Sequence, residues 1–153
     1  MKLSKAKYTL LLQNIGSSIT TARKNAAKAV NTELVKANWE IGRHIVKFEQ
    51  QGEERAEYES SLISSPSRDL QKKHGKGFGR RNLLDMRRFY LAYGKWQTVS
   101  AKFSWSHYVT LISITNEITR NFYEKQCIIE DWSVRELERQ VNSSLFEIGR
   151  AHV

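Results

Sequence analysis

Four arginines that follow a glycine-rich turn are the residues whose type and spacing best match a chemical task. Arg80 and Arg81 form one adjacent pair, and Arg87 and Arg88 form a second pair seven residues later. Seven residues make nearly two turns of an α-helix, so both pairs lie on one side of it. The other side carries apolar and aromatic residues, namely Leu83, Met86, Phe89, Tyr90 and Tyr93. The pattern predicts a helix that packs on its apolar side and presents guanidinium groups, which bind phosphate oxygens.

The positive charge of the chain is concentrated around these arginines. The 153 residues carry a formal net charge of +9, and the isoelectric point is about 9.8. From Lys72 to Arg88 there are seven Lys or Arg residues and one acid, Asp85, so this segment supplies six of the nine excess charges. Lys72, Lys73 and Lys76 precede the arginines. Such a cluster favours a polyanionic partner, and the alternative is a solvated basic face without one.

No group of residues in the sequence has the spacing expected of a catalytic site or a metal site. The four histidines lack a second ligand at metal-binding spacing on one helix face; they are His44, His74, His107 and His152. The acids are spread along predicted helices, including Glu33, Glu40, Glu53, Glu54 and Glu57. The glycines of residues 75–79 follow a helix rather than a strand, unlike those of a nucleotide-binding loop. We therefore expect no catalytic residue, metal ligand or cofactor-binding residue in this chain.

A second polar and aromatic cluster lies at Trp105-Ser106-His107-Tyr108. Its side chains could stack on a base or hold a phosphate. Alternatively, Trp105 and Tyr108 belong to the core and His107 satisfies a local hydrogen bond. For Trp105 we expect the core role, and for His107 both interpretations stay open.

Nearly every segment is predicted to be helical, so the fold class is all-α. A long helix is expected from about Tyr8 to Gln51, and a break at Gly16-Ser17-Ser18 would divide it into two. One apolar stripe runs along it, because its members are spaced by three or four residues. They are Val30, Leu34, Ala37, Ile41, Ile45 and Phe48. We expect Trp39, Ile41 and Ile45 to anchor the core or a contact between helices.

Shorter helices are expected after the long one. A helix from Glu53 to Ile63 precedes Ser65-Pro66, which is typical of an N-cap and a first helical residue. The helix to about Lys73, the glycine turn and the arginine helix then resemble a helix-turn-helix unit. Residues 96–103 form a loop or a short strand. The last helices are predicted over 105–114, over 117–130, and from a capping box at Ser133 to about residue 145.

The cysteine count and the length of the apolar runs indicate where in the cell the protein is expected. Cys127 is the only cysteine, so no internal disulfide can form, and its apolar neighbours predict a buried thiol. The run Leu10–Leu12 is too short for a signal peptide or a membrane span. A reducing, bacterial-type cytoplasm is the expected location.

Several separate motifs resemble the N-terminal domain of the YhcG family and occur in that family's order. They are Asn31–Leu34, Asn38–Ile45, Gly77–Leu83, Met86–Tyr90, Ser104–Tyr108 and Trp132–Gln140. The resemblance implies a helical domain that binds DNA and precedes a C-terminal nuclease domain of the PD-(D/E)XK type. That second domain would carry the catalytic acids and the divalent metal. Two departures are Ser64-Ser65-Pro66, where relatives continue a helix, and Gly79, where many relatives have a capping serine.

The end of the chain also departs from the family. Residues 1–146 are similar to the helical domain, and the nuclease domain is expected to be missing. The residues Ile148–Val153 match the translation of a sequencing adapter. We therefore expect residues 147–153 to be an artefactual tail.

The sequence leaves two interpretations of function. In the first, the chain is the DNA-binding part of a larger nuclease, and its contacts come from the lysines, the arginine helix and His107. In the second, it is a module for protein interaction or dimerisation, and the stripe through Ile41 and Ile45 pairs with a copy of itself or another protein. Affinity for DNA would fall steeply with salt in the first case only.

Overall fold

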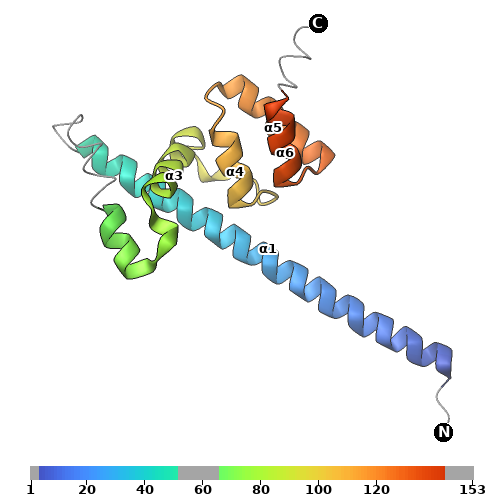
Figure 1. Ribbon diagram of the computed structural model, residues 1–153. Coiled ribbons are helices and arrows are strands. Elements are labelled where there is room, and N and C mark those ends of the chain that lie inside the picture. The colour runs from blue at the N-terminus through green and yellow to red at the C-terminus, as the bar shows by residue number, and fades with distance from the viewer. Residues whose placement is uncertain (1–3, 52–65, 144–153) are drawn as a thin grey trace, which may run out of the picture.

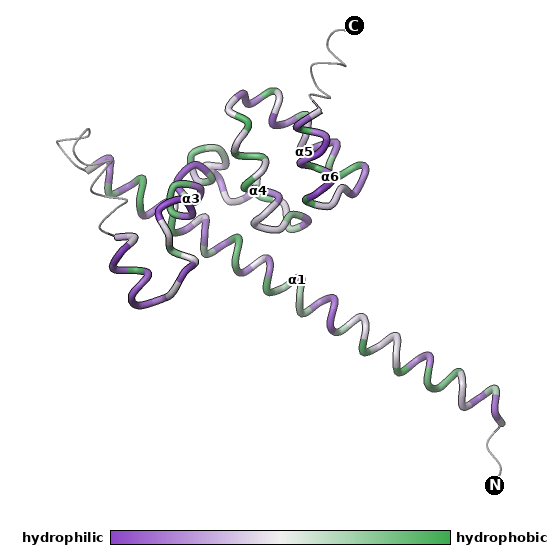
Figure 2. Tube along the Cα trace, in the orientation of Figure 1, coloured by the Kyte–Doolittle hydropathy of each residue, from purple (hydrophilic) through white to green (hydrophobic). Residues whose placement is uncertain are grey.

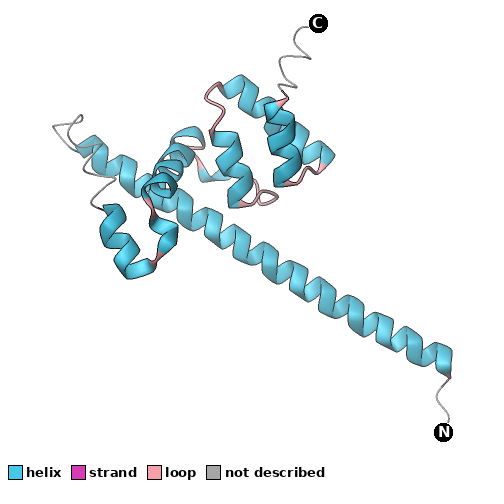
Figure 3. Cartoon of the chain, in the orientation of Figure 1, coloured by secondary structure: helices cyan, strands magenta, loops and turns pink. Residues whose placement is uncertain are grey.

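The computed structural model describes residues 4–51 and 66–143. Within these ranges every regular element is a helix and no strand occurs, which confirms the all-α prediction (Figure 3). The elements are α1 (Lys5–Gln51), a helix over residues 66–74, the 3₁₀ turn η1 (Lys76–Phe78), α3 (Arg80–Ala92), the 3₁₀ turn η2 (Trp96–Thr98), α4 (Trp105–Ile112), α5 (Glu117–Glu130) and α6 (Val134–Asn142). The helix expected over 53–63 and the tail at 147–153 lie outside the described residues.

The helix α1 is a single rod of 47 residues and does not break at Gly16-Ser17-Ser18. The other helices gather around its C-terminal half, and its N-terminal half projects away from them (Figure 1). From Lys5 to Asn31 every residue is exposed to solvent. The projecting part, which we call the arm, therefore has no buried side chain that would stabilise it as a helix.

The face of α1 that packs on the other helices differs from the predicted stripe. The buried residues are Val35, Asn38, Gly42, Val46 and Glu49, which recur at helical spacing. Three members of the stripe are exposed, because Val30, Leu34 and Phe48 retain 67%, 48% and 51% of their accessible surface. Only Ile41 and Ile45 reach the core, and both are partly buried against Leu83 and Met86 of α3. The expected anchoring role is therefore confirmed for Ile41 and Ile45, whereas Val30, Leu34 and Phe48 lie outside this core.

A close approach between α1 and α3 explains this difference. A Cβ atom at Gly42 would collide with the backbone carbonyl group of Met86. The two helices can therefore approach here only because position 42 has no side chain. Glycine contributes nothing to a hydrophobic pattern, so the contact face cannot be recognised by hydrophobicity alone.

Aromatic rings form the centre of the core. Phe89 and Tyr108 are fully buried with their ring centroids 4.6 Å apart, and Tyr93 and Phe103 pack beside them. Trp39 contributes from α1, where its indole Nε1 donates a 2.7 Å hydrogen bond to the carbonyl oxygen of Tyr93. These contacts confirm the core role expected for Trp39.

The remaining core residues confirm two more predictions. Cys127 is buried, and burial raises the pKa of its thiol to about 11. Trp105 packs by its ring against Phe89, with centroids 5.3 Å apart, as the core interpretation expected. Leu111 of α4 and Leu137 of α6 complete the cluster and join the C-terminal helices to α3.

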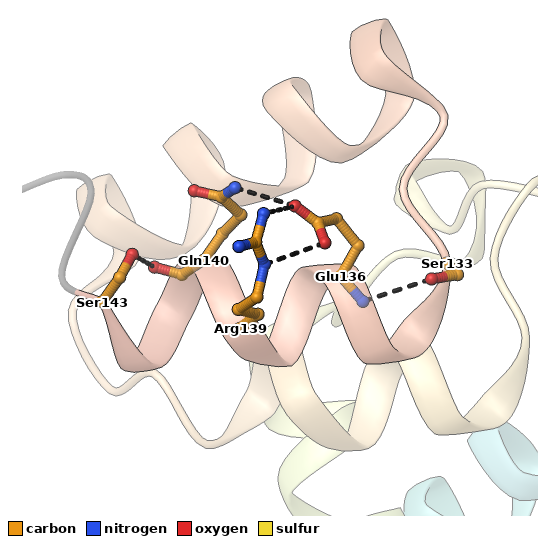
Figure 4. A network of polar contacts seen from close by, with 5 residues as sticks. All are labelled: Ser133, Glu136, Arg139, Gln140 and Ser143. Carbon is orange, nitrogen blue, oxygen red and sulfur yellow. Dashed lines mark hydrogen bonds and ion pairs between the residues drawn. The ribbon is translucent and has the colours of Figure 1, made fainter.

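Side-chain caps fix where the C-terminal helices begin. The Asn116 side chain accepts from the amide of Thr119 at the start of α5, and the Ser133 hydroxyl accepts from the amide of Glu136 in α6. The predicted capping box at Ser133 is only half formed. The Glu136 carboxylate instead accepts hydrogen bonds from Arg139 and Gln140 (Figure 4). Residues 96–98 form η2 rather than a strand, and the predicted end of α6 at residue 145 lies outside the described residues.

Candidate nucleic-acid interface

The turn between the helix over residues 66–74 and α3 is held by polar contacts. Gly75 has a φ of 95°, a backbone region that favours glycine, and its amide donates to the carbonyl of Gln71 at 2.9 Å. The hydroxyl of Ser67 donates to the carbonyl of Phe78 at 3.1 Å, and the Asn82 amide group donates to the carbonyl of Gly77 at 2.7 Å. The turn therefore joins two helices of the structure, and side chains from both of them hold it in place.

Asn82 also connects this unit to α4. Its side-chain oxygen lies 3.4 Å from the indole Nε1 of Trp105, which donates to it. Because Asn82 lies in the first turn of α3, the start of that helix has a fixed position relative to α4. No side chain caps the N-terminus of α3, since Gly79 occupies the cap position in an extended conformation. A helix N-terminus without a capping side chain carries amide groups and a partial positive charge that favour anions.

Three of the four predicted arginines are exposed on α3. Arg80 and Arg81 lie at its first turn, and the Arg88 side chain keeps 59% of its accessible surface. Arg88 lies 3.5 Å from the carboxylate of Asp85, which is largely buried. Burial raises the pKa of Asp85, although Arg88 and Arg81 act in the opposite direction. These contacts leave most of the Arg88 guanidinium group accessible to solvent.

The fourth arginine has a different environment. Arg87 Nε donates to the Glu49 carboxylate of α1 at 2.6 Å, and the Arg87 side chain is 27% exposed. Glu49 is nearly buried, so its charge needs a partner such as this guanidinium group. Arg87 therefore joins α3 to α1, and helical periodicity alone placed it incorrectly with the solvent-facing arginines. Its contact with nucleic acid stays a prediction that the geometry does not favour.

The predicted lysines lie on the same unit and are exposed. Lys72 and Lys73 belong to the helix over residues 66–74, and Lys76 starts η1. Arg68 is also exposed on that helix and was missed by the sequence reasoning. Arg68 lies four residues before Lys72, so both residues share one helix face. This spacing could have identified Arg68 from the sequence.

A shallow groove of about 500 Å³ runs between the start of α3 and α4. Lys76 and Arg81 line it from one side, and the hydroxyl-bearing residues Ser106 and Thr110 line it from α4. Cations and hydroxyl groups are the side chains that commonly contact phosphate oxygens. Asp85 and Glu138 also line this groove, so its lining combines acids with cations.

The structure gives His107 a local role. The Ser104 amide donates to Nδ1 at 3.2 Å, and Nε2 lies 3.0 Å from the carbonyl oxygen of Trp132. A nitrogen that accepts a hydrogen bond has no proton, so the proton of neutral His107 lies on Nε2 and is donated to Trp132. Ser104 and His107 thus form a reciprocal cap of α4. A contact between His107 and nucleic acid stays a prediction, although both of its ring nitrogens have protein partners.

Two other kinds of site are absent from residues 4–51 and 66–143. No group of three or more His, Cys, Asp or Glu side chains there is arranged to hold a metal ion. In the same ranges, no helix combines the length and the apolar character needed to cross a membrane.

The described residues form an all-α domain with one long helix and a basic helix that follows a glycine turn. Residues 14–148 match the family model described as the DUF1016 N-terminal domain, and the chain belongs to this family. It is 35% identical to a protein of Escherichia coli (strain K12) named "Putative nuclease YhcG", over 174 aligned positions. The alignment covers 93% of this chain and 46% of that relative, so the chain spans about half the relative's length. No solved structure matches the chain.

Proposed function

We propose that this chain is the nucleic-acid-binding part of a nuclease and that it binds the phosphate backbone of DNA through its basic helix-turn-helix unit. The contacts come from a set of exposed cations, which we call the basic face: Arg68, Lys72, Lys73, Lys76, Arg80, Arg81 and Arg88. The relative named as a nuclease supports a nucleic-acid substrate. Cleavage, with its catalytic acids and divalent metal, would belong to a part of the protein that corresponds to the remaining length of that relative.

The observation that carries this proposal is the gathering of exposed cations around a turn of fixed conformation. All seven lie on a segment of 21 residues that Ser67, Asn82 and Trp105 hold in place. Preorganised cations lose little conformational freedom when they meet a phosphate backbone, so they bind it more tightly than cations on a flexible chain. The N-terminus of α3, with Arg80 and Arg81 beside it, adds amide groups that suit a phosphate.

A mobility-shift titration with a random-sequence DNA duplex across a range of salt concentrations tests the proposal. The variant Arg80→Ala with Arg81→Ala and Arg88→Ala should bind more weakly, and the slope of log affinity against log salt should fall by about one unit per lost phosphate contact. The control variant Lys95→Ala with Lys102→Ala and Lys125→Ala removes the same charge from exposed positions elsewhere. Equal losses in the two triple variants would contradict the proposal, because only net charge would then matter.

A further inference from the structure

A continuous apolar stripe on α1 lies away from the body of the protein. It begins in the arm at Tyr8 and runs at spacings of three or four residues to Ile41, and Phe48 lies seven residues further along the same side. Its members are Tyr8, Leu12, Ile15, Ile19, Ala22, Ala26, Val30, Leu34, Ala37, Ile41 and Phe48. All of them except Ile41 are exposed. Green segments accordingly recur along the arm, where no other helix covers them (Figure 2).

The stripe and the packing face occupy different sides of α1. At 100° per residue, Ile15 and Ile19 lie on the side opposite to Val35, Gly42 and Val46, which face the body. Among the described residues, the other helices therefore leave the stripe uncovered from Tyr8 to Ala37. An exposed apolar surface of this length normally marks an interface, and an uncovered arm would be only marginally stable as a helix.

We propose that the stripe is covered by the α1 helix of a second copy of this chain, in antiparallel orientation. The helix that covers the stripe must be about as long as the stripe itself. At 1.5 Å per residue the stripe extends for about 60 Å. A second α1 has that length. A strip of roughly 60 Å by 10 Å on each helix amounts to about 600 Å², which approaches the roughly 800 Å² per partner of a stable interface.

The sizes of the side chains favour one antiparallel register. In this register residue 28 of one helix lies level with residue 28 of the other. Each small residue of the stripe then lies level with a larger residue of the second copy. Ala26 then lies level with Val30 of the second copy, and Ala22 with its Leu34. In the same register Ile19 meets Ala37, and Ile15 meets Ile41. Alternation of large and small side chains allows helices to pack closely without voids. A parallel pair in register would instead place alanine against alanine in three layers.

The charges of α1 also favour the antiparallel orientation. From residue 5 to residue 30 all five charged side chains are basic: Lys5, Lys7, Arg23, Lys24 and Lys28. From residue 31 to residue 51 three acids balance three bases, and Glu33 and Glu40 are exposed. A parallel pair would bring the two basic halves together, whereas an antiparallel pair places each beside a neutral half. The mutual repulsion is therefore smaller in the antiparallel pair.

Sedimentation velocity of the 153-residue chain tests the pairing. The variant Ile15→Asp with Ile19→Asp places two charges in the stripe and should weaken the dimer by at least about 100-fold. The matched control, Ser17→Asp with Thr21→Asp, adds the same charges to the opposite side of the arm and should remain dimeric. Both sites lie in the exposed arm, so the body should fold in either variant, as a thermal melt would show. A wild-type chain that stays monomeric at about 100 µM would overturn the proposal. A monomeric chain that binds anionic lipid vesicles through the stripe would also overturn it.

Disulfide crosslinking tests the orientation. The double variant Ile19→Cys with Ala37→Cys should form a covalent dimer under mild oxidation, because positions 19 and 37 lie level in the antiparallel register. The single variant Ile19→Cys should not form this covalent dimer, because the thiols at position 19 of the two copies would be about 27 Å apart along the helix axis. The wild type serves as the control, since its only thiol, Cys127, is buried. Efficient crosslinking of the single variant would indicate a parallel pair and overturn the proposed arrangement.

Discussion

Gly42 of α1 and Met86 of α3 approach so closely that no side chain fits between them, because a Cβ atom at position 42 would collide with the Met86 carbonyl group. The contact fixes how α3 lies on α1. It therefore also determines where the arginines of α3 point, although Gly42 is far from them in sequence.

Gly42→Ala should destabilise the fold by at least about 1–3 kcal/mol, the range for overpacking in a core. The obstacle is backbone, which cannot move aside as a flexible side chain would. Gly16 is the matched control, since it lies in the same helix and nothing surrounds a Cβ atom there. Gly16→Ala should stabilise the arm by up to about 1 kcal/mol. Urea unfolding of both variants gives the comparison, and equal stabilities would show that the helices can separate at little cost.

Arg87 and Arg88 should respond differently to the same substitution. Arg87→Ala leaves the nearly buried Glu49 carboxylate without this partner, so it should cost about 2–3 kcal/mol, somewhat below the range for a fully buried pair. Arg88→Ala removes a long, exposed contact with Asp85 and should change stability by no more than about 0.5 kcal/mol. Thermal melts of the two variants decide the matter. If Arg88→Ala proved the more damaging of the two, the assignment of Arg87 to the contact between α1 and α3 would fail.

His107→Ala should lower the stability by about 1–2 kcal/mol, because α4 loses part of its cap and the carbonyl of Trp132 loses a donor. DNA affinity of the folded variant should not change. Ser106→Ala is a suitable comparison for stability alone, since Ser106 is exposed and makes no contribution to the cap. A variant that keeps its stability and loses DNA affinity would instead assign His107 to the interface.

The pair Tyr93 and Glu124 should make stability depend on pH. The Tyr93 hydroxyl donates to the Glu124 carboxylate at 3.2 Å. Burial raises the pKa of Glu124 above its ordinary value of 4.5, although Tyr93, Arg120 and Lys125 oppose the shift. The folded chain then binds this proton more tightly than the unfolded chain. This group's contribution to stability is therefore largest at low pH and is lost as the pH rises above about 4.5.

Glu124→Gln should remove this contribution. Urea unfolding at a series of pH values from about 4 to 7 should show a flatter dependence for the variant than for the wild type. Glu117→Gln, at an exposed position in the first turn of the same helix, is the comparison and should change the slope less. Identical slopes for wild type and Glu124→Gln would mean that the Glu124 pKa is not raised by folding.

The sequence predicted most of the helices because their signals are local. Ser104, Asn116 and Ser133 each accept from an amide three residues ahead, and a contact of that range can be recognised from residue spacing. Six of the seven residues of the basic face were predicted for the same reason, since they are close in sequence, and Arg68 was missed. The expected core role of Trp105 rested on its chemical type, because large aromatic rings are rarely left in water.

Contacts between distant residues could not be predicted in this way. Glu49 and Arg87 are 38 positions apart, so helical periodicity placed Arg87 with the exposed arginines without reference to α1. The packing face of α1 contains Asn38, Gly42 and Glu49, which no hydrophobic pattern would select. The stripe that the pattern did select lies mostly in solvent. Hydrophobic spacing shows which side of a helix needs a partner, but it does not show whether that partner belongs to the same chain.

The unbroken course of α1 has a consequence for the spacing of DNA sites. In the proposed antiparallel pair, Gly42 of one copy lies level with residue 14 of the other. The two α3 helices would therefore be separated by about 28 helical residues, or roughly 42 Å along the axis. At about 3.4 Å per base pair this distance corresponds to about 12 base pairs, somewhat more than one turn of the double helix. A rigid α1 would thus act as a ruler that selects paired sites at one preferred interval.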